Sequence, residues 1–138
     1  MLPAHLASVR LFLHVVAATV WVGGQITLVA LVPALRRAGG PDLTRTAARR
    51  FQMVAWPAYA VLLVTGVWNL SAVHVGDQSS DYLTTLFVKL VLVGVSGAGA
   101  LAHTLFARTR PALGGIAAAI GLLAALGATF LGIVLAGS

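Results

Sequence analysis

The sequence of 138 residues is 59% hydrophobic and only 9% charged, and its formal net charge is +6. A water-soluble domain of this length could not cover so much apolar surface with so few charges. This composition excludes an ordinary soluble protein and predicts an integral membrane protein, whose main partner is the lipid bilayer. The absence of cysteine also excludes disulfides and thiolate metal sites.

Four long apolar runs follow one another along the chain, at about residues 7–35, 51–73, 83–107 and 113–136. Each reaches the roughly 20 residues that a helix needs to cross the hydrocarbon core. The runs are continuously apolar and too long for the ~10-residue strands of a β-barrel. The first run is also about twice as long as the apolar centre of a signal peptide. The sequence therefore predicts an all-α fold, an integral membrane four-helix bundle that forms a single domain over residues 1–138.

Arginines gather in two of the three connections between these runs. They are Arg36, Arg37, Arg45, Arg49 and Arg50 after the first run, and Arg108 and Arg110 after the third. The connection after the second run contains Asp77 and Asp81 and no Lys or Arg. Because basic connections stay in the cytoplasm, the N- and C-termini are predicted to lie outside, in a multi-pass protein of the cell membrane. The same arginines account for the net charge, so nucleic acid is not expected as a partner.

Polar residues form a stripe on the first predicted helix. His14, Trp21 and Gln25 are separated by seven and four residues, so they share one face at about 100° per residue. The second run adds Thr65 and Asn69, one turn apart. Polar groups inside a span face the interior of a helix bundle, which predicts a polar interior in an apolar shell. The candidates for contact with a bound cofactor on these two helices are His14, Trp21, Gln25 and Asn69.

A second polar stripe lies on the third predicted helix, where Lys89, Ser96 and His103 repeat every seven residues. His14 and Lys89 each lie about six residues into parallel helices, roughly 9 Å below the outer boundary, and so are predicted to be at similar depth. His103 lies about 20 Å deeper, which argues against one haem iron between His14 and His103. Lys89 is a candidate catalytic and cofactor-binding residue. The alternative is that its ammonium extends to the outer headgroups.

Histidines are the candidate metal ligands in a chain without cysteine. His14 is the first candidate because it lies within a span and on the polar stripe. His74 and His5, on the predicted outer side, are weaker candidates, for which a hydrogen bond to a carbonyl or headgroup is the alternative. His103 is a separate, weak candidate on the inner side, where an interfacial position is the alternative.

Small residues recur at four-residue spacing in the third and fourth runs. They are Gly94, Ala98 and Ala102 in the third run, and Ala117, Gly121, Ala125, Ala124, Ala128, Gly132 and Ala136 in the fourth. Such spacing lets helix backbones approach closely in lipid. It predicts close packing either inside the bundle or against a second copy, as a homo-oligomer through the small-residue faces of the third and fourth helices.

Several short motifs resemble a known family. They are "LHVVAATVWVGG", "LVPALRR", "RRF", "TGVWN" and "YLTTLFVKLVLV", in this order. Together they resemble the CopD-like copper resistance membrane domain. A more distant likeness is to the HemJ-type protoporphyrinogen oxidases, which are small haem-containing four-helix membrane proteins. The resemblance covers the first three predicted helices, and the fourth matches only in being apolar.

The two likenesses imply different chemistry for the same residues. Resemblance to HemJ implies that His14 is a haem b ligand and that Lys89 matters for activity, whereas resemblance to CopD implies copper import or tolerance. Only Met1 and Met53 offer sulfur, the donor that Cu(I) prefers, so this sequence departs from a copper path. The Gly23–Gly24 pair departs from HemJ.

The function expected from these observations is the binding of haem b or another metal near the outer membrane face, for electron transfer or copper handling. A redox partner is then implied. One alternative is a haem-dependent membrane oxidoreductase with a porphyrin substrate, in which Lys89 would hold a propionate. Another is an accessory membrane subunit without a cofactor.

Overall fold

The computed structural model describes residues 5–138, and within that range it contains helices and no strand. The elements are α1 (Leu6–Ala18), the π-helical turn η1 (Thr19–Gly23), α2 (Gly24–Ser71), the 3₁₀ turn η2 (Val75–Asp77), α3 (Ser80–Phe106) and α4 (Pro111–Ala136). The predicted all-α class is confirmed. The main difference from the sequence prediction lies at residues 36–50, which are expected to be a connection but are helical except at Gly39 and Gly40.

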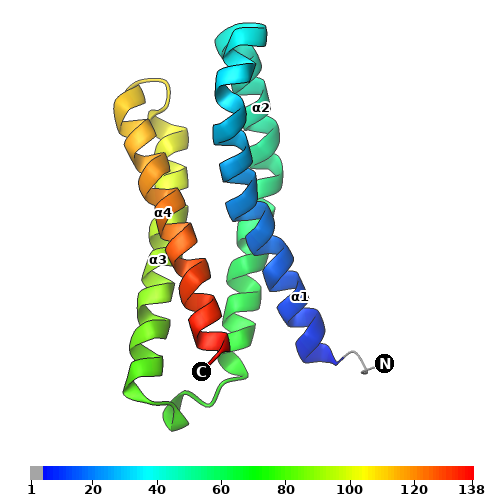
Figure 1. Ribbon diagram of the computed structural model, residues 1–138, viewed down its shortest axis with the longest axis vertical. Coiled ribbons are helices and arrows are strands. Elements are labelled where there is room, and N and C mark those ends of the chain that lie inside the picture. Colours follow the sequence, from blue (N-terminus) through cyan, green and yellow to red (C-terminus); the bar gives the residue numbers. More distant parts are fainter. Residues whose placement is uncertain (1–4) are drawn as a thin grey trace. The chain divides into compact units, whose positions relative to one another are not determined.

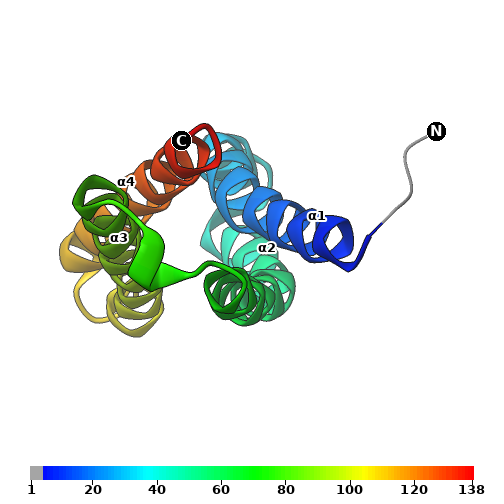
Figure 2. The same ribbon diagram turned by 90° about the horizontal axis from the view of Figure 1, so that it is seen from below.

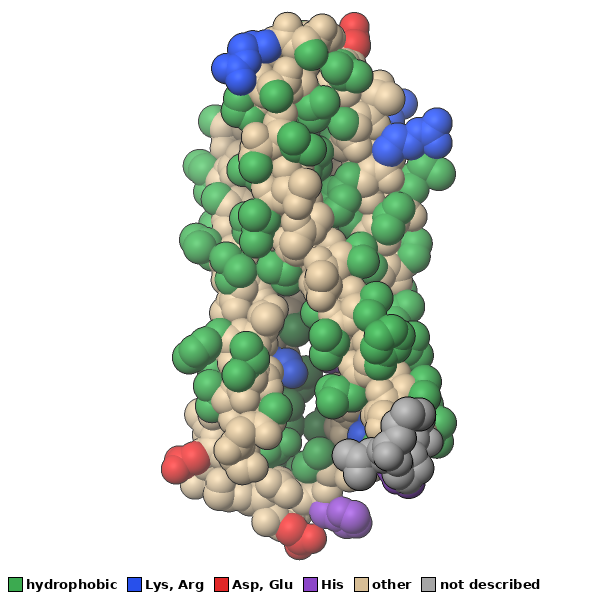
Figure 3. Space-filling model, turned by 45° about the vertical axis from the view of Figure 1, so that its right-hand side comes forward, with side chains coloured by type: hydrophobic (Ala, Val, Ile, Leu, Met, Phe, Trp, Pro, Cys, Tyr) green, Lys and Arg blue, Asp and Glu red, His purple; other side chains and the backbone are tan. Residues whose placement is uncertain are grey.

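Three helical stretches in the described residues are long and apolar enough to cross a membrane. They are Leu6–Ser71, Ser80–Phe106 and Pro111–Ala136, with mean hydropathies of 2.0, 1.9 and 2.3 over their most apolar 18 residues. Only 11%, 17% and 22% of those windows are buried. Large apolar side chains therefore cover the outer surface along the helices, as Figure 3 shows in green. This surface has the character expected of helices surrounded by lipid.

The chain divides into two compact units, Met1–Val73 and His74–Ser138. The first unit is a helical hairpin whose two arms run in opposite directions (Figure 1). Its contacts show the register, because His14 bonds to Thr65 and Trp21 packs on Trp56. In these pairs an increase in one residue number accompanies a decrease in the other, which is the pattern of antiparallel helices.

The hairpin of the first unit reverses at Gly39–Gly40. Gly40 has a φ of 66°, which is a conformation that glycine adopts without steric cost. Pro41 follows directly, at a position where the missing N–H of proline costs no helical hydrogen bond. Asp42 then forms an exposed ion pair of 3.1 Å with Arg45. The local sequence Gly-Gly-Pro-Asp therefore stops one helical arm and starts the next.

The second unit is the antiparallel hairpin of α3 and α4, which lie side by side in Figures 1 and 2. The two backbones approach most closely at Gly99 and Gly121. A Cβ atom on Gly99 would lie 2.6 Å from the Ala117 carbonyl oxygen and 2.8 Å from the Gly121 Cα. The predicted role of small residues in close packing is thus observed on α4, where Gly121, Ala124, Ala125 and Ala128 are buried.

The small-residue face predicted for α3 is not the face that packs on α4. Gly94 and Ala98 are exposed, and nothing lies within 4 Å of a Cβ atom placed on Gly94. The buried residues of α3 are instead Ser96, Gly97 and Gly99. Small residues therefore occur on both faces of this helix, so their presence alone does not select the packing face.

Candidate functional site: a histidine held by a threonine inside the first hairpin

His14 and Thr65 join the two arms of the first unit. The His14 Nδ1 atom lies 2.8 Å from the Thr65 hydroxyl oxygen, and Thr65 is only 3% exposed. His14 itself is half-buried on α1. Gly66, next to Thr65, leaves room for the ring, since a Cβ atom there would lie 3.7 Å from His14 Cε1. A titratable imidazole is therefore held inside an apolar hairpin by a specific hydrogen bond.

The Thr65 hydroxyl contacts a backbone carbonyl as well as the His14 ring. Its oxygen lies 2.6 Å from the Val61 carbonyl oxygen, to which it donates its hydrogen. The hydroxyl has one hydrogen, so toward His14 it can only accept. In the tautomer in which the Thr65 hydrogen stays on the Val61 carbonyl, Nδ1 of His14 donates this bond and the lone pair lies on Nε2. This is the arrangement in which a histidine binds a metal through Nε2, with its other ring nitrogen oriented by a neighbouring oxygen.

An aromatic cluster lies between the two arms of the hairpin, closer than His14 to the Gly39–Gly40 reversal. Trp21, 3% exposed, has its ring centroid 4.5 Å from Tyr59 and 5.6 Å from Trp56. Trp56 and Tyr59 also contact each other edge to face at 5.9 Å. The sequence stripe identified Trp21, but not Tyr59. The antiparallel register, which places residues near 58 opposite Trp21, is the signal that finds it.

The stripe of the first helix is interrupted by η1. Residues Thr19–Gly23 form a π-helical turn, so the constant 100° per residue assumed for His14, Trp21 and Gln25 does not hold through it. His14 and Trp21 nevertheless both contact α2. The Gln25 amide donates to the Trp21 carbonyl at 2.9 Å, so its donor is engaged by the backbone of its own helix. Single π turns are frequent at functional sites and reorient the side chains that follow.

The polar stripe of α3 faces α4 in the second unit. Ser96 is 2% exposed, and a Cβ atom on Gly132 would lie 3.2 Å from Lys89 Nζ. Lys89 therefore lies beside Gly132 of α4. It forms no ion pair with any residue of 5–138. His103 Nδ1 lies 2.9 Å from the Gly114 carbonyl oxygen. Because a carbonyl can only accept, His103 donates this bond, which ties the end of α3 to the start of α4.

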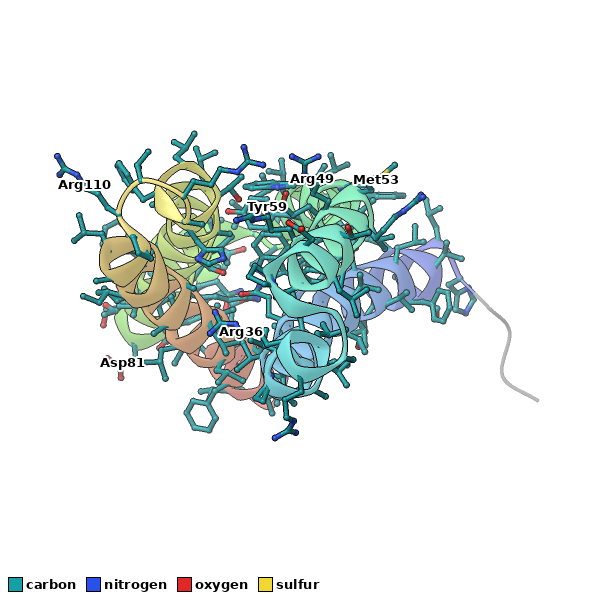
Figure 4. The ribbon with its side chains drawn as sticks, turned by 90° about the horizontal axis from the view of Figure 1, so that it is seen from above. Arg36, Arg49, Met53, Tyr59, Asp81 and Arg110 are labelled. Carbon is teal, nitrogen blue, oxygen red and sulfur yellow. The ribbon has the colours of Figure 1, made fainter. Side chains whose placement is uncertain are left out.

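The other candidate residues lie at or near the ends of the helices. His5 and His74 are exposed, and Asn69 is half-buried in the last turn of α2. Met53 is 68% exposed and projects away from α2 (Figure 4). Within residues 5–138 no three His, Asp or Glu side chains form a group suited to a metal ion. His14 and Asn69 belong to the first unit, whereas Lys89, His74 and His103 belong to the second.

Comparisons with known proteins add no family to this picture. No protein-family model, curated protein or solved structure matches this chain.

Proposed function

We propose that this is a multi-pass membrane protein that binds haem b at His14 and takes part in electron transfer. The four predicted runs would cross the bilayer, with both termini and the His14 end of the first hairpin toward the outside. The observation that supports this function is the hydrogen bond between His14 Nδ1 and Thr65, because in the tautomer that protonates Nδ1 the lone pair lies on Nε2. One imidazole is sufficient as the axial ligand of a haem, so the proposal needs no second histidine.

The surroundings of His14 fit a porphyrin in their chemistry. The ring lies in a helical hairpin with an apolar exterior, next to Gly66 and on the same hairpin as Trp21, Trp56 and Tyr59. Apolar and aromatic side chains are the residues that usually line the binding site of a large apolar macrocycle. When bound, the haem iron would supply one-electron chemistry, and the chain would contribute the ligand and its orientation.

The arginine distribution supports the proposed orientation. Both helical reversals, at Gly39–Gly40 and at residues 107–110, lie among arginines, whereas the connection containing η2 has Asp77 and no Lys or Arg. Figure 4 shows Arg110 directed away from the α3–α4 hairpin, free to reach headgroups or water. By the positive-inside rule the two reversals face the cytoplasm and η2 faces outward.

The orientation is tested by placing single cysteines in a chain that has none. Cysteine at Gly76, exposed and with nothing within 4 Å of a Cβ atom, is expected to react with a membrane-impermeant thiol reagent on intact cells. Cysteine at Ala38, exposed beside the first reversal, is expected to react only after the cells are permeabilised. The reverse labelling would contradict the proposed orientation.

The cofactor is tested by an absorption spectrum and a metal analysis of the protein purified from membranes. A Soret band with equimolar iron is the expected result, and haem should also bind the apoprotein at about one per chain. Copper without haem would instead support copper handling. No metal, no pigment and no uptake of added haem would contradict the proposal and favour an accessory subunit.

A second candidate function is the oxidation of a porphyrinogen to a porphyrin, with the electrons passing to a redox partner, and Lys89 favours it. An ammonium without an ion-pair partner among the described residues, inside an apolar helix, is suited to a carboxylate brought by a ligand. Porphyrinogen oxidation by the haem-loaded protein, lost in Lys89→Met, would establish this activity. Unchanged turnover in Lys89→Met would remove the role of this lysine.

A further inference from the structure

Arg10 is a cation near the start of α1 for which the proposed haem ligand provides no role. Its guanidinium carbon lies 5.9 Å from the centroid of the Trp68 ring, on the other arm of the same hairpin. Its Nε atom is buried and has no hydrogen-bond partner. Among residues 5–138, every other buried side-chain nitrogen or oxygen has one. Arg10 is thus folded back onto the hairpin, with one donor enclosed and unused.

An enclosed guanidinium N–H without an acceptor is costly. A buried donor without an acceptor destabilises a protein, and it does so more strongly when the group is charged. The cation–π contact with Trp68 offsets part of the cost and holds the guanidinium in place, but it satisfies no N–H.

The first unit offers no acidic side chain that could pair with Arg10. The acidic residues of the chain are Asp42, Asp77 and Asp81, of which only Asp42 lies in this unit. Asp42 is next to the Gly39–Gly40 reversal, at the opposite end of the hairpin from Arg10, and pairs with Arg45. No ion pair of Arg10 is formed among residues 5–138, and its own unit could supply an anion near it only from a bound molecule.

Arg10 and His14 are four residues apart, so they share a face of α1 and are separated by roughly 6 Å along the helix axis. The antiparallel register that sets His14 opposite Thr65 also sets Arg10 level with Asn69, one turn beyond Thr65. The site that contains the proposed haem ligand thus continues toward the chain terminus into an arginine, an asparagine and the face of Trp68.

We propose that Arg10 binds an oxyanion at this end of the hairpin, either the carboxylate of a porphyrin held by His14 or the phosphate of a lipid headgroup. The planar fork of a guanidinium presents paired N–H donors to two oxygens of either group. The Trp68 ring contacts the guanidinium, and the bound oxyanion accepts hydrogen bonds from it. The porphyrin source rests on the proposed function, whereas the lipid source does not.

The porphyrin source is tested with haem and haem dimethyl ester, in which both propionates are neutral. The apoprotein in detergent is titrated with each, in the parent chain and in Arg10→Gln. The parent is expected to bind haem at least about tenfold more tightly than the ester, the fold-change that matches one charge-assisted hydrogen bond. Arg10→Gln should lose this preference, and Arg10→Lys should recover part of it.

The lipid source is tested by mass spectrometry of the intact protein released from nanodiscs that contain phosphatidylglycerol and phosphatidylcholine. The parent is expected to retain one phospholipid more than Arg10→Gln if the oxyanion is a headgroup phosphate. Arg108→Gln is the control in both measurements, because it removes an exposed arginine from the α3–α4 connection. Circular dichroism and elution volume show that each variant is folded.

The outcomes distinguish a porphyrin carboxylate from a lipid phosphate, and they test oxyanion binding by Arg10 separately from haem binding at His14. A preference for haem over its ester that depends on Arg10 identifies the porphyrin carboxylate. A retained lipid that depends on Arg10 identifies the headgroup phosphate, even in a protein that binds no haem. If folded Arg10→Gln matches the parent in ester preference and in lipid retention, Arg10 binds no oxyanion and the inference is wrong.

Discussion

His14→Ala is expected to lower the affinity of the protein for haem by more than about 100-fold, because it removes the proposed haem ligand itself. Loss of a partner that merely orients a ligand already costs about 10–100-fold. The measurement is a titration of the apoprotein with haem, followed by the Soret band. His103→Gln is the control, because glutamine retains a donor for the Gly114 carbonyl in the second unit. An equal loss from both substitutions would contradict a single site at His14.

Thr65→Val belongs to the same prediction, since it replaces the hydroxyl with a methyl group of similar size. It is expected to weaken haem binding by about 10–100-fold, because Nδ1 loses the acceptor that sets the tautomer and the ring orientation. Thr65→Ser should retain most of the affinity. Thr19→Val is the matched control: Thr19 also donates to the carbonyl four residues earlier, but it is exposed. Unchanged affinity in Thr65→Val would show that this hydrogen bond serves packing alone.

Gly99→Ala is expected to destabilise the α3–α4 hairpin by about 1–3 kcal/mol, the usual cost of forcing extra volume into a packed contact. The added Cβ would meet the Ala117 carbonyl oxygen at 2.6 Å, and a backbone atom of a packed helix cannot move aside alone. The free energy of unfolding is measured by titrating the protein in mild detergent with a denaturing detergent.

Gly94→Ala provides the matched control for this second prediction. It lies in the interior of the same helix, is exposed, and has nothing within 4 Å of the added Cβ. Alanine favours a helix over glycine by up to about 1 kcal/mol, so Gly94→Ala should be neutral or stabilising. The same helix propensity acts at Gly99, so the difference between the two variants measures the contact alone. Equal effects would mean that α3 and α4 do not pack closely at Gly99 in the membrane.

The sequence predicts the part of the candidate site that depends on one helix at a time. A histidine and a tryptophan seven residues apart in an apolar run indicate a polar face, and both side chains do contact the other arm of the hairpin. Their partners across the hairpin were not predicted. Thr65 appears in the sequence only as a polar residue of the second run, and Tyr59 and Arg10 do not stand out.

The missing step is the register between the two arms. Once Gly40 is known to adopt a positive φ and reverse the chain, counting outward in both directions brings His14 to Thr65 and Trp21 to Trp56. The motif Gly-Gly-Pro-Asp signals this turn. However, the chain is helical through the arginines before and after Gly39–Gly40. Hydropathy therefore predicts where the apolar span ends, but not the residue at which the chain reverses.

Composition and hydropathy, which are sums over many residues, determine by themselves that this protein is helical and that its helices are apolar enough for a membrane. Tertiary structure alone decided which polar atoms meet, because a hydrogen bond depends on the positions of two atoms to within a few tenths of an ångström. It also decided the packing face of α3. Small residues occur on both faces there, and only the approach of Gly121 to Gly99 selects one of them.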